Sequence, residues 1–271
     1  MRAIRSALFM PASNARAIEK ARGLECDAVI LDLEDAVAPE VKEAARDQAL
    51  AAARDGGFGP RLLVLRVNAL DTEWGVADCR AAAGAGFDAV LLPKVSHPDH
   101  LAAARSVLGE VPLWAMIETC AAMLALPAIA AAPGLACLVA GTNDLAKDMR
   151  CTPGADRAPL LPHLTAIVTV ARAHGLIALD GVSNVLADTP ELTAECAAGA
   201  AFGFDGKTLI HPAQIAPANR AFSPSPERVA WARRVIAAFG LPEHAGKGAI
   251  RVDGEMVERL HLAEAERIVS K

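Results

Sequence analysis

Short apolar runs alternate with longer, Ala-rich stretches along most of the chain. Most of these runs are continuous rather than alternating, which is typical of parallel strands that are covered on both faces. We expect eight strands, at residues 3–9, 28–33, 62–67, 89–93, 113–117, 136–140, 176–179 and 206–210. Eight strands separated by helices predict an α/β fold, a (β/α)₈ TIM barrel.

The helices between these runs have recognisable ends. Ser13 is expected to cap a helix over residues 14–23, and Pro98 opens a helix that ends before Gly109. Ser225 followed by a proline provides a cap and a first-turn residue for a long helix that stops at Gly240. We therefore expect a barrel domain at residues 1–222 and a C-terminal helical extension or lid at residues 223–271.

Polar residues occur at the carboxyl ends of the predicted strands. In a barrel they would converge on one point at the C-terminal mouth, which a doubly wound open sheet would not achieve. These residues are Asp32, Arg66, Lys94, Glu118, Asp144, Asp180 and Lys207.

Composition excludes several classes of partner. The 271 residues are 53% hydrophobic, carry a net charge of −5 and contain 4% aromatic residues, so a nucleic-acid partner is not expected. The uncharged segment 119–143 is broken by prolines, so no membrane span is expected. The six cysteines form no C-x-x-C pair, and with no signal peptide we expect reduced thiols in a cytoplasmic protein.

Glu118 and Asp144 suggest a metal site. They lie 26 residues apart, about one strand-helix unit, and should stand on neighbouring strands. Two carboxylates at one mouth repel each other unless a cation or proton lies between them. Oxygen ligands without nearby His or Cys favour Mg²⁺. The alternative is that each carboxylate caps the helix that follows it.

The other charged residues of the mouth also allow two interpretations. Glu34 and Asp35 either cap a helix or hold metal-bound waters. Arg66 either neutralises these acids or binds a substrate carboxylate with both arms of its guanidinium. Lys94 either pairs with the acids or forms a Schiff base.

Nine segments in order resemble the citrate lyase β-subunit and malyl-CoA lyase family of CoA-ester lyases. The segments are RSALFMP, DLEDAV, RVN, LLPK, MIET, GTNDL, LDGV, GFDGKTLIHPAQI and VDGEMVE. The resemblance implies a Mg²⁺-dependent TIM barrel, commonly a homotrimer. Such an enzyme cleaves or forms a 3-hydroxyacyl-CoA such as malyl-CoA or citramalyl-CoA, with a 2-oxoacid and an acyl-CoA as the small-molecule partners.

The resemblance also implies roles for individual residues. Glu118 and Asp144 would bind Mg²⁺, and Glu118 would also lie against the substrate. Arg66 would contact the oxoacid half and act in catalysis, while Glu34 and Asp35 would support the metal-bound waters. The CoA phosphates would lie near three basic residues, Arg5, Arg16 and Lys20.

One position departs from the family pattern. The family often has Asp in a tail that reaches a neighbouring subunit's site as the acid/base, whereas this tail has Glu258. A Glu keeps that chemistry with one more methylene. Three alternatives stay open: a metal-dependent aldolase acting on free hydroxy acids, a malyl-CoA thioesterase, and a β-subunit that works only in a citrate lyase complex.

Overall fold

The chain folds into two compact units. The computed structural model describes residues 3–269; one unit comprises residues 4–222 and the other comprises residue 3 and residues 223–269. The four remaining residues of the two expected domains, 1, 2, 270 and 271, lie outside the described residues. Each unit has a core of its own.

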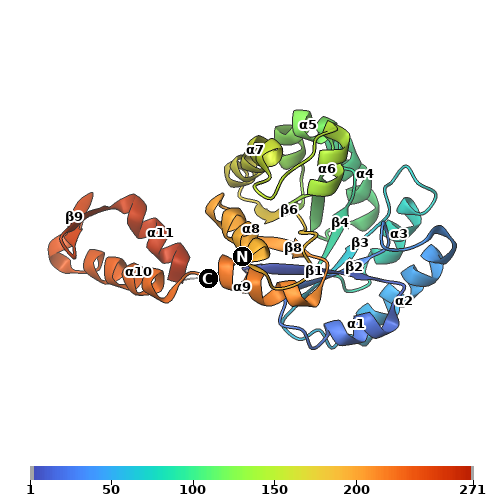
Figure 1. The fold of residues 1–271 in the computed structure, drawn as a ribbon, viewed down its shortest axis with the longest axis horizontal. Helices are drawn as coiled ribbons and strands as arrows, with labels where there is room; N and C mark the ends of the chain where they lie inside the picture. Colours follow the sequence, from blue (N-terminus) through green and yellow to red (C-terminus); the bar gives the residue numbers. More distant parts are fainter. Residues whose placement is uncertain (1–2, 270–271) are drawn as a thin grey trace. The chain divides into compact units, whose positions relative to one another are not determined.

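The larger unit is a closed barrel of eight parallel strands in sequence order, in which β8 pairs with β1. Figure 1 shows the helices around this ring of strands. The TIM-barrel prediction is therefore confirmed. The strands are β1 (Ser6–Pro11), β2 (Ala28–Asp32), β3 (Leu62–Arg66), β4 (Ala89–Leu92), β5 (Leu113–Ile117), β6 (Leu135–Ala140), β7 (Ile177–Asp180) and β8 (Gly206–Leu209).

Nine helices of this unit follow or flank the strands. They are α1 (Ala15–Ala21), α2 (Lys42–Asp55), α3 (Gly75–Ala82), α4 (Pro98–Leu108), α5 (Cys120–Ala130), α6 (Thr142–Met149), α7 (Leu161–Ala173), α8 (Pro190–Ala201) and α9 (Ile215–Phe222). Helix α4 has the predicted ends. Helix α1 does not, because the side chain of Asn14, not Ser13, accepts the backbone N–H of Ala17.

Alternate residues of most strands face two different apolar layers. On β2, Ala28 and Ile30 belong to the cluster inside the barrel, while Val29 and Leu31 belong to the layer beneath the helices. Both faces of the strand are thus buried, which explains the continuous apolar runs. The largest error in strand position is at β1, which begins at Ser6. The backbone N–H of the preceding residue, Arg5, donates to the Asp27 carboxylate instead of joining a strand ladder.

The smaller unit contains α10 (Pro226–Phe239), β9 (Ala249–Val252), β10 (Glu255–Glu258) and α11 (Arg259–Val269). Strands β9 and β10 form an antiparallel hairpin that was not predicted. Its turn residues Asp253 and Gly254 both have positive φ, at 52° and 86°, as a tight hairpin turn requires. Over residues 3–269, no helix is both long and apolar enough to cross a bilayer.

Candidate active site at the barrel mouth

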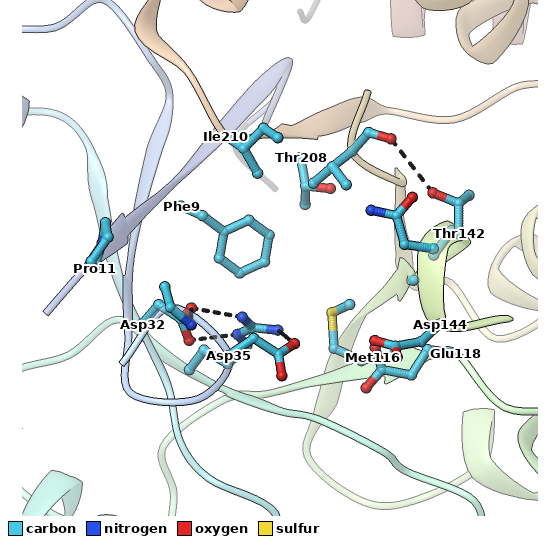
Figure 2. Close-up of a pocket in the computed structure, with 16 residues that line it drawn as sticks. Phe9, Pro11, Asp32, Asp35, Met116, Glu118, Thr142, Asp144, Thr208 and Ile210 are labelled. Atoms are coloured by element: carbon cyan, nitrogen blue, oxygen red, sulfur yellow. Dashed lines mark hydrogen bonds and ion pairs between the residues drawn. The ribbon is translucent and has the colours of Figure 1, made fainter. Parts of the chain in front are cut away.

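A cavity of about 360 Å³ opens at the carboxyl ends of the strands. This is the face on which TIM-barrel enzymes carry their active sites. Figure 2 shows Phe9 projecting into the pocket, with Glu118 and Asp144 next to each other near Met116. Arg66 and Asp32 also line the cavity. The predicted metal pair and the predicted substrate arginine therefore share one pocket.

Glu118 directly follows β5 and is 1% exposed. Its Oε1 accepts the backbone N–H of Lys94 at 2.6 Å, whereas its buried Oε2 has no hydrogen-bond partner within the described chain. Burial raises the pKa of Glu118, and the charge of Lys94 opposes this effect. A buried carboxylate oxygen without a partner is costly, and a bound cation would satisfy it.

Asp144 lies in the first turn of α6, with its Oδ2 2.9 Å from Lys94 Nζ. The same nitrogen lies 3.6 Å from Glu118 Oε1, so one ammonium group contacts both carboxylates. Helix-capping does not account for Glu118, because α5 is capped by Thr119, whose side chain accepts the Ala122 N–H. Lys94 thus makes the ion pairs that one of its two interpretations predicted.

Arg66 is fixed by its neighbours. The register of β2 and β3 places Asp32 beside it, and the two side chains form a pair of 2.6 Å hydrogen bonds. These bonds are the two dashed lines at Asp32 in Figure 2. The guanidinium carbon also lies 4.8 Å from the centre of the Phe9 ring. Burial lowers the pKa of Arg66, but Asp32 and the nearby acids outweigh it and raise the pKa overall.

Glu34 and Asp35 surround the same guanidinium. Glu34 Oε2 lies 2.7 Å from Arg66 Nη1, as an ion pair that lacks hydrogen-bond alignment. Glu34 Oε1 lies 3.7 Å from Lys94 Nζ. Burial raises the pKa of Glu34 to about 7, although Arg66 partly offsets the effect. Asp35 is more exposed, with its Oδ2 3.5 Å from Arg66. Glu34 therefore connects Arg66, through Lys94, to the Glu118–Asp144 pair.

The strand-end residues do not all converge on one point, contrary to the sequence prediction. Asp180 and Lys207 are 0% exposed and form a separate cluster with Arg157 and Glu195. Lys207 Nζ lies 2.9 Å from Asp180 Oδ2 and 2.7 Å from Glu195 Oε1. Asp180 and Lys207 share the outer face of their strands with Ala178 and Leu209, beneath the helices, so the pair does not line the main cavity.

The predicted CoA-binding residues do not form one cluster. Arg5 precedes β1 and lies at the opposite end of the barrel from the mouth, where it pairs with Asp27 at 2.9 Å. This placement does not favour the predicted CoA contact. Arg16 and Lys20 are exposed on α1, one helical turn apart. Glu258 ends β10 in the smaller unit, with its backbone N–H bound to His261 Nδ1.

Sequence reasoning missed two contributors to this site. Asp32 was identified only as a strand-end residue, yet it orients Arg66 and accepts the backbone N–H groups of Glu34 and Ala36. Gly141 was not identified at all. A Cβ at this position would lie 2.7 Å from Glu118 Oε2, so only glycine lets the carboxylate approach so closely. The register of β2 and β3 could have indicated the role of Asp32 but not that of Gly141.

The donor set fits a hard cation. No three His, Cys, Asp or Glu side chains within residues 3–269 are placed to hold a metal on their own. Mg²⁺ is often bound by one or two carboxylates, with water and substrate oxygens as its other ligands. Glu118, with its unpartnered oxygen, and Asp144 match that requirement.

Comparisons with known proteins agree with this chemistry. The chain is 48% identical over 267 residues to a (3S)-malyl-CoA thioesterase of Cereibacter sphaeroides, covering 98% of this chain and 94% of the relative. It is 30% identical over 287 residues to the human mitochondrial citramalyl-CoA lyase, covering 98% of this chain and 84% of the relative. A solved structure of CitE from Mycobacterium tuberculosis, in complex with magnesium, acetoacetate and coenzyme A, superposes with a TM-score of 0.81 at 34% identity, covering 99% of both chains. Residues 5–212 match the HpcH/HpaI aldolase/citrate lyase family, and the chain belongs to this family of lyases.

Proposed function

We propose that this enzyme uses Mg²⁺ to cleave, or to form, the carbon–carbon bond of a 3-hydroxyacyl-CoA such as malyl-CoA or citramalyl-CoA. The products of cleavage are a 2-oxoacid and an acyl-CoA. The observation that carries the proposal is the geometry of the two acids. Glu118 and Asp144 both contact the Lys94 ammonium and lie beside the buried Arg66 in a cavity at the barrel mouth. The citramalyl-CoA lyase relative and the CitE complex with magnesium and coenzyme A support it.

Glu118 and Asp144 would hold the Mg²⁺ ion. When bound, the ion would polarise the substrate oxygens and stabilise the negative charge that develops on them during cleavage. Burial of Glu118 makes this position favourable for a cation, because the unpartnered Oε2 gains a ligand.

Arg66 would bind the carboxylate of the oxoacid half. Its guanidinium is already oriented by Asp32 and stacked on Phe9, so little side-chain entropy is lost when the substrate binds. Glu34 and Asp35 would keep this guanidinium in place and hold waters around the metal ligands.

Cleavage moves one proton. The hydroxyl proton leaves as the bond between the carbinol carbon and the thioester α-carbon breaks, and the resulting thioester enolate takes a proton on carbon. One acid/base group can serve both transfers. We assign it to Glu258, in a homotrimer in which the C-terminal unit serves a neighbouring site. A Glu258→Gln variant should lose about 100-fold or more in kcat while it keeps Mg²⁺ affinity.

The test is a product assay. Purified enzyme with Mg²⁺ and malyl-CoA or citramalyl-CoA should release glyoxylate or pyruvate, detected as the phenylhydrazone. Glu118→Gln and Asp144→Asn should abolish release. Asp148→Asn is the matched control, because Asp148 lies one turn further along α6 and contacts the Cys120 N–H instead of the site. Full activity in Asp144→Asn would exclude the metal assignment.

A thioesterase is the second candidate, and the 48% identical (3S)-malyl-CoA thioesterase favours it. Hydrolysis adds water to the thioester and yields malate and free CoA thiol. Carbon–carbon cleavage instead yields glyoxylate and acetyl-CoA, without free thiol. Thiol and oxoacid assays on the same reaction therefore distinguish the two reactions.

A further inference from the structure

Lys94 serves the carboxylate pair with both its backbone and its side chain. It follows β4 and has a φ of 52°, a left-handed conformation that is uncommon for residues other than glycine. In this conformation its N–H reaches Glu118 Oε1 at 2.6 Å, and its ammonium reaches Asp144 Oδ2 at 2.9 Å. The strained backbone thus places one positive charge between the two acids.

Three carboxylates contact this ammonium. Besides Asp144, Lys94 Nζ lies 3.6 Å from Glu118 Oε1 and 3.7 Å from Glu34 Oε1. Without a cation these acids would repel one another at short range. The ammonium therefore occupies the electrostatic position that a divalent ion would take.

We propose that Lys94 is an internal counter-cation that holds the acidic pair together in the metal-free enzyme and is displaced when Mg²⁺ binds. This inference rests on the proposed metal site at Glu118 and Asp144. An ammonium in contact with Asp144 and a divalent ion on the same carboxylate repel each other, so the two cations exclude one another.

The structure provides a place for the displaced side chain. Lys94 also lines a second cavity of about 300 Å³ beside the mouth, together with Asp71, Asp99 and His100. Its side chain is 36% exposed and unbranched, so it can rotate towards these acids without disturbing the core. Asp71 and Asp99 would compensate the charge of the displaced ammonium.

Calorimetric titration with MgCl₂ tests the inference. Lys94→Met removes the ammonium and keeps the backbone N–H and most of the side-chain volume, so we expect the Kd for Mg²⁺ to fall about tenfold. Lys147→Met is the matched control, because Lys147 is exposed on α6, about one turn after Asp144, and its ammonium does not pair with Glu34, Glu118 or Asp144. Its Kd should stay within about twofold of wild type, because solvent and salt screen the charge of an exposed ammonium.

Thermal unfolding gives a readout independent of activity. Lys94→Met should have a lower Tm than wild type without metal, and saturating Mg²⁺ should remove most of this difference. A variant that folds only with Mg²⁺ is the extreme form of the same result. An unchanged or higher Kd in Lys94→Met, or an equal fall in Lys147→Met, overturns the inference.

A labelling experiment on the wild-type enzyme covers the case in which Lys94→Met does not fold at all. Mg²⁺ should increase acetylation of Lys94 several-fold, relative to Lys147, because the released side chain becomes accessible; no increase overturns the inference. Glu118→Gln and Asp144→Asn separate the two hypotheses. Wild type that does not bind Mg²⁺, or binding that survives in both variants, rejects the metal site. Mg²⁺ binding that requires both acids but has the same Kd in Lys94→Met as in wild type rejects only the present inference.

Discussion

Gly141 is the position where one methyl group should disable the site. It lies between β6 and α6, and its N–H donates to the carbonyl of Ile117. A Cβ there would lie 2.4 Å from Glu118 Cβ, 2.7 Å from Glu118 Oε2 and 3.1 Å from Met116 Cε. The first two distances are too short for any real contact, so Gly141→Ala must displace Glu118 or the start of α6.

The magnitude follows from the overlap. Forcing a methyl group into a packed site costs about 1–3 kcal/mol. For a domain of this size that corresponds to a fall in Tm of about 2–12 °C. A displacement of about 1 Å in a positioned group lowers the rate by about 100-fold. We therefore expect a folded variant with greatly reduced kcat and weaker Mg²⁺ binding.

The assay compares Gly141→Ala with Gly23→Ala. A Cβ at Gly23 would meet only the carbonyl of Lys20, at an ordinary 3.8 Å, so that control should keep its Tm and activity. Unfolding is followed by circular dichroism, Mg²⁺ binding by calorimetry and turnover by oxoacid release. A Gly141→Ala enzyme with wild-type kcat and Mg²⁺ affinity would refute the steric reasoning.

Three further predictions concern charged groups. Arg66→Lys keeps the charge but loses the two-armed geometry, so kcat/KM should fall at least tenfold in the oxoacid assay; unchanged kinetics would contradict this role. Lys207→Met removes one of the cations that pair with the buried carboxylates Asp180 and Glu195. The free energy of unfolding in urea should fall by about 3–5 kcal/mol, whereas Lys147→Met should leave it nearly unchanged. Burial raises the pKa of Asp27, but its bonds with Arg5 outweigh this and lower the pKa overall. Wild type should therefore have a larger free energy of unfolding than Asp27→Asn at pH 7, and this difference should shrink as the pH falls below about 4. A difference that does not change with pH would contradict the prediction.

The barrel could be predicted from the sequence because its determinants are local. Most strands are short apolar runs bounded by turns, and both faces are buried, so the runs are continuous and easy to delimit. The β9–β10 hairpin was missed although Asp253 and Gly254 are a strong turn signal. Each of its strands buries only one residue, so the hydrophobic pattern that identified the barrel strands is weak there.

The candidate site was predictable only in part. Glu118, Asp144 and Arg66 were identified because they end or follow strands, and the barrel brings all strand ends to one face. The ion pairs of Lys94 depend on a positive φ that no sequence pattern indicated. The placement of Arg5 depends on Asp27, which precedes the neighbouring strand. Because β1 begins only at Ser6, Arg5 lies at the end of the barrel opposite the mouth.

Two strand-end ion pairs illustrate why charge and a position at a strand end could not by themselves separate a pair that lines the cavity from one that does not. Asp32 and Arg66 are register neighbours on β2 and β3, as are Asp180 and Lys207 on β7 and β8. The difference is the face of the strand. Asp32 and Arg66 lie on the inner face with Ile30 and Val64, whereas Asp180 and Lys207 lie on the outer face with Ala178 and Leu209. Gly199 of α8 lets that helix approach so closely that a Cβ would lie 2.7 Å from Asp180 Oδ2, and Arg157 covers the other side. The first pair instead lines the cavity beside Phe9. Access to the cavity therefore depends on which face of the strand a charged residue occupies and not on the charge itself.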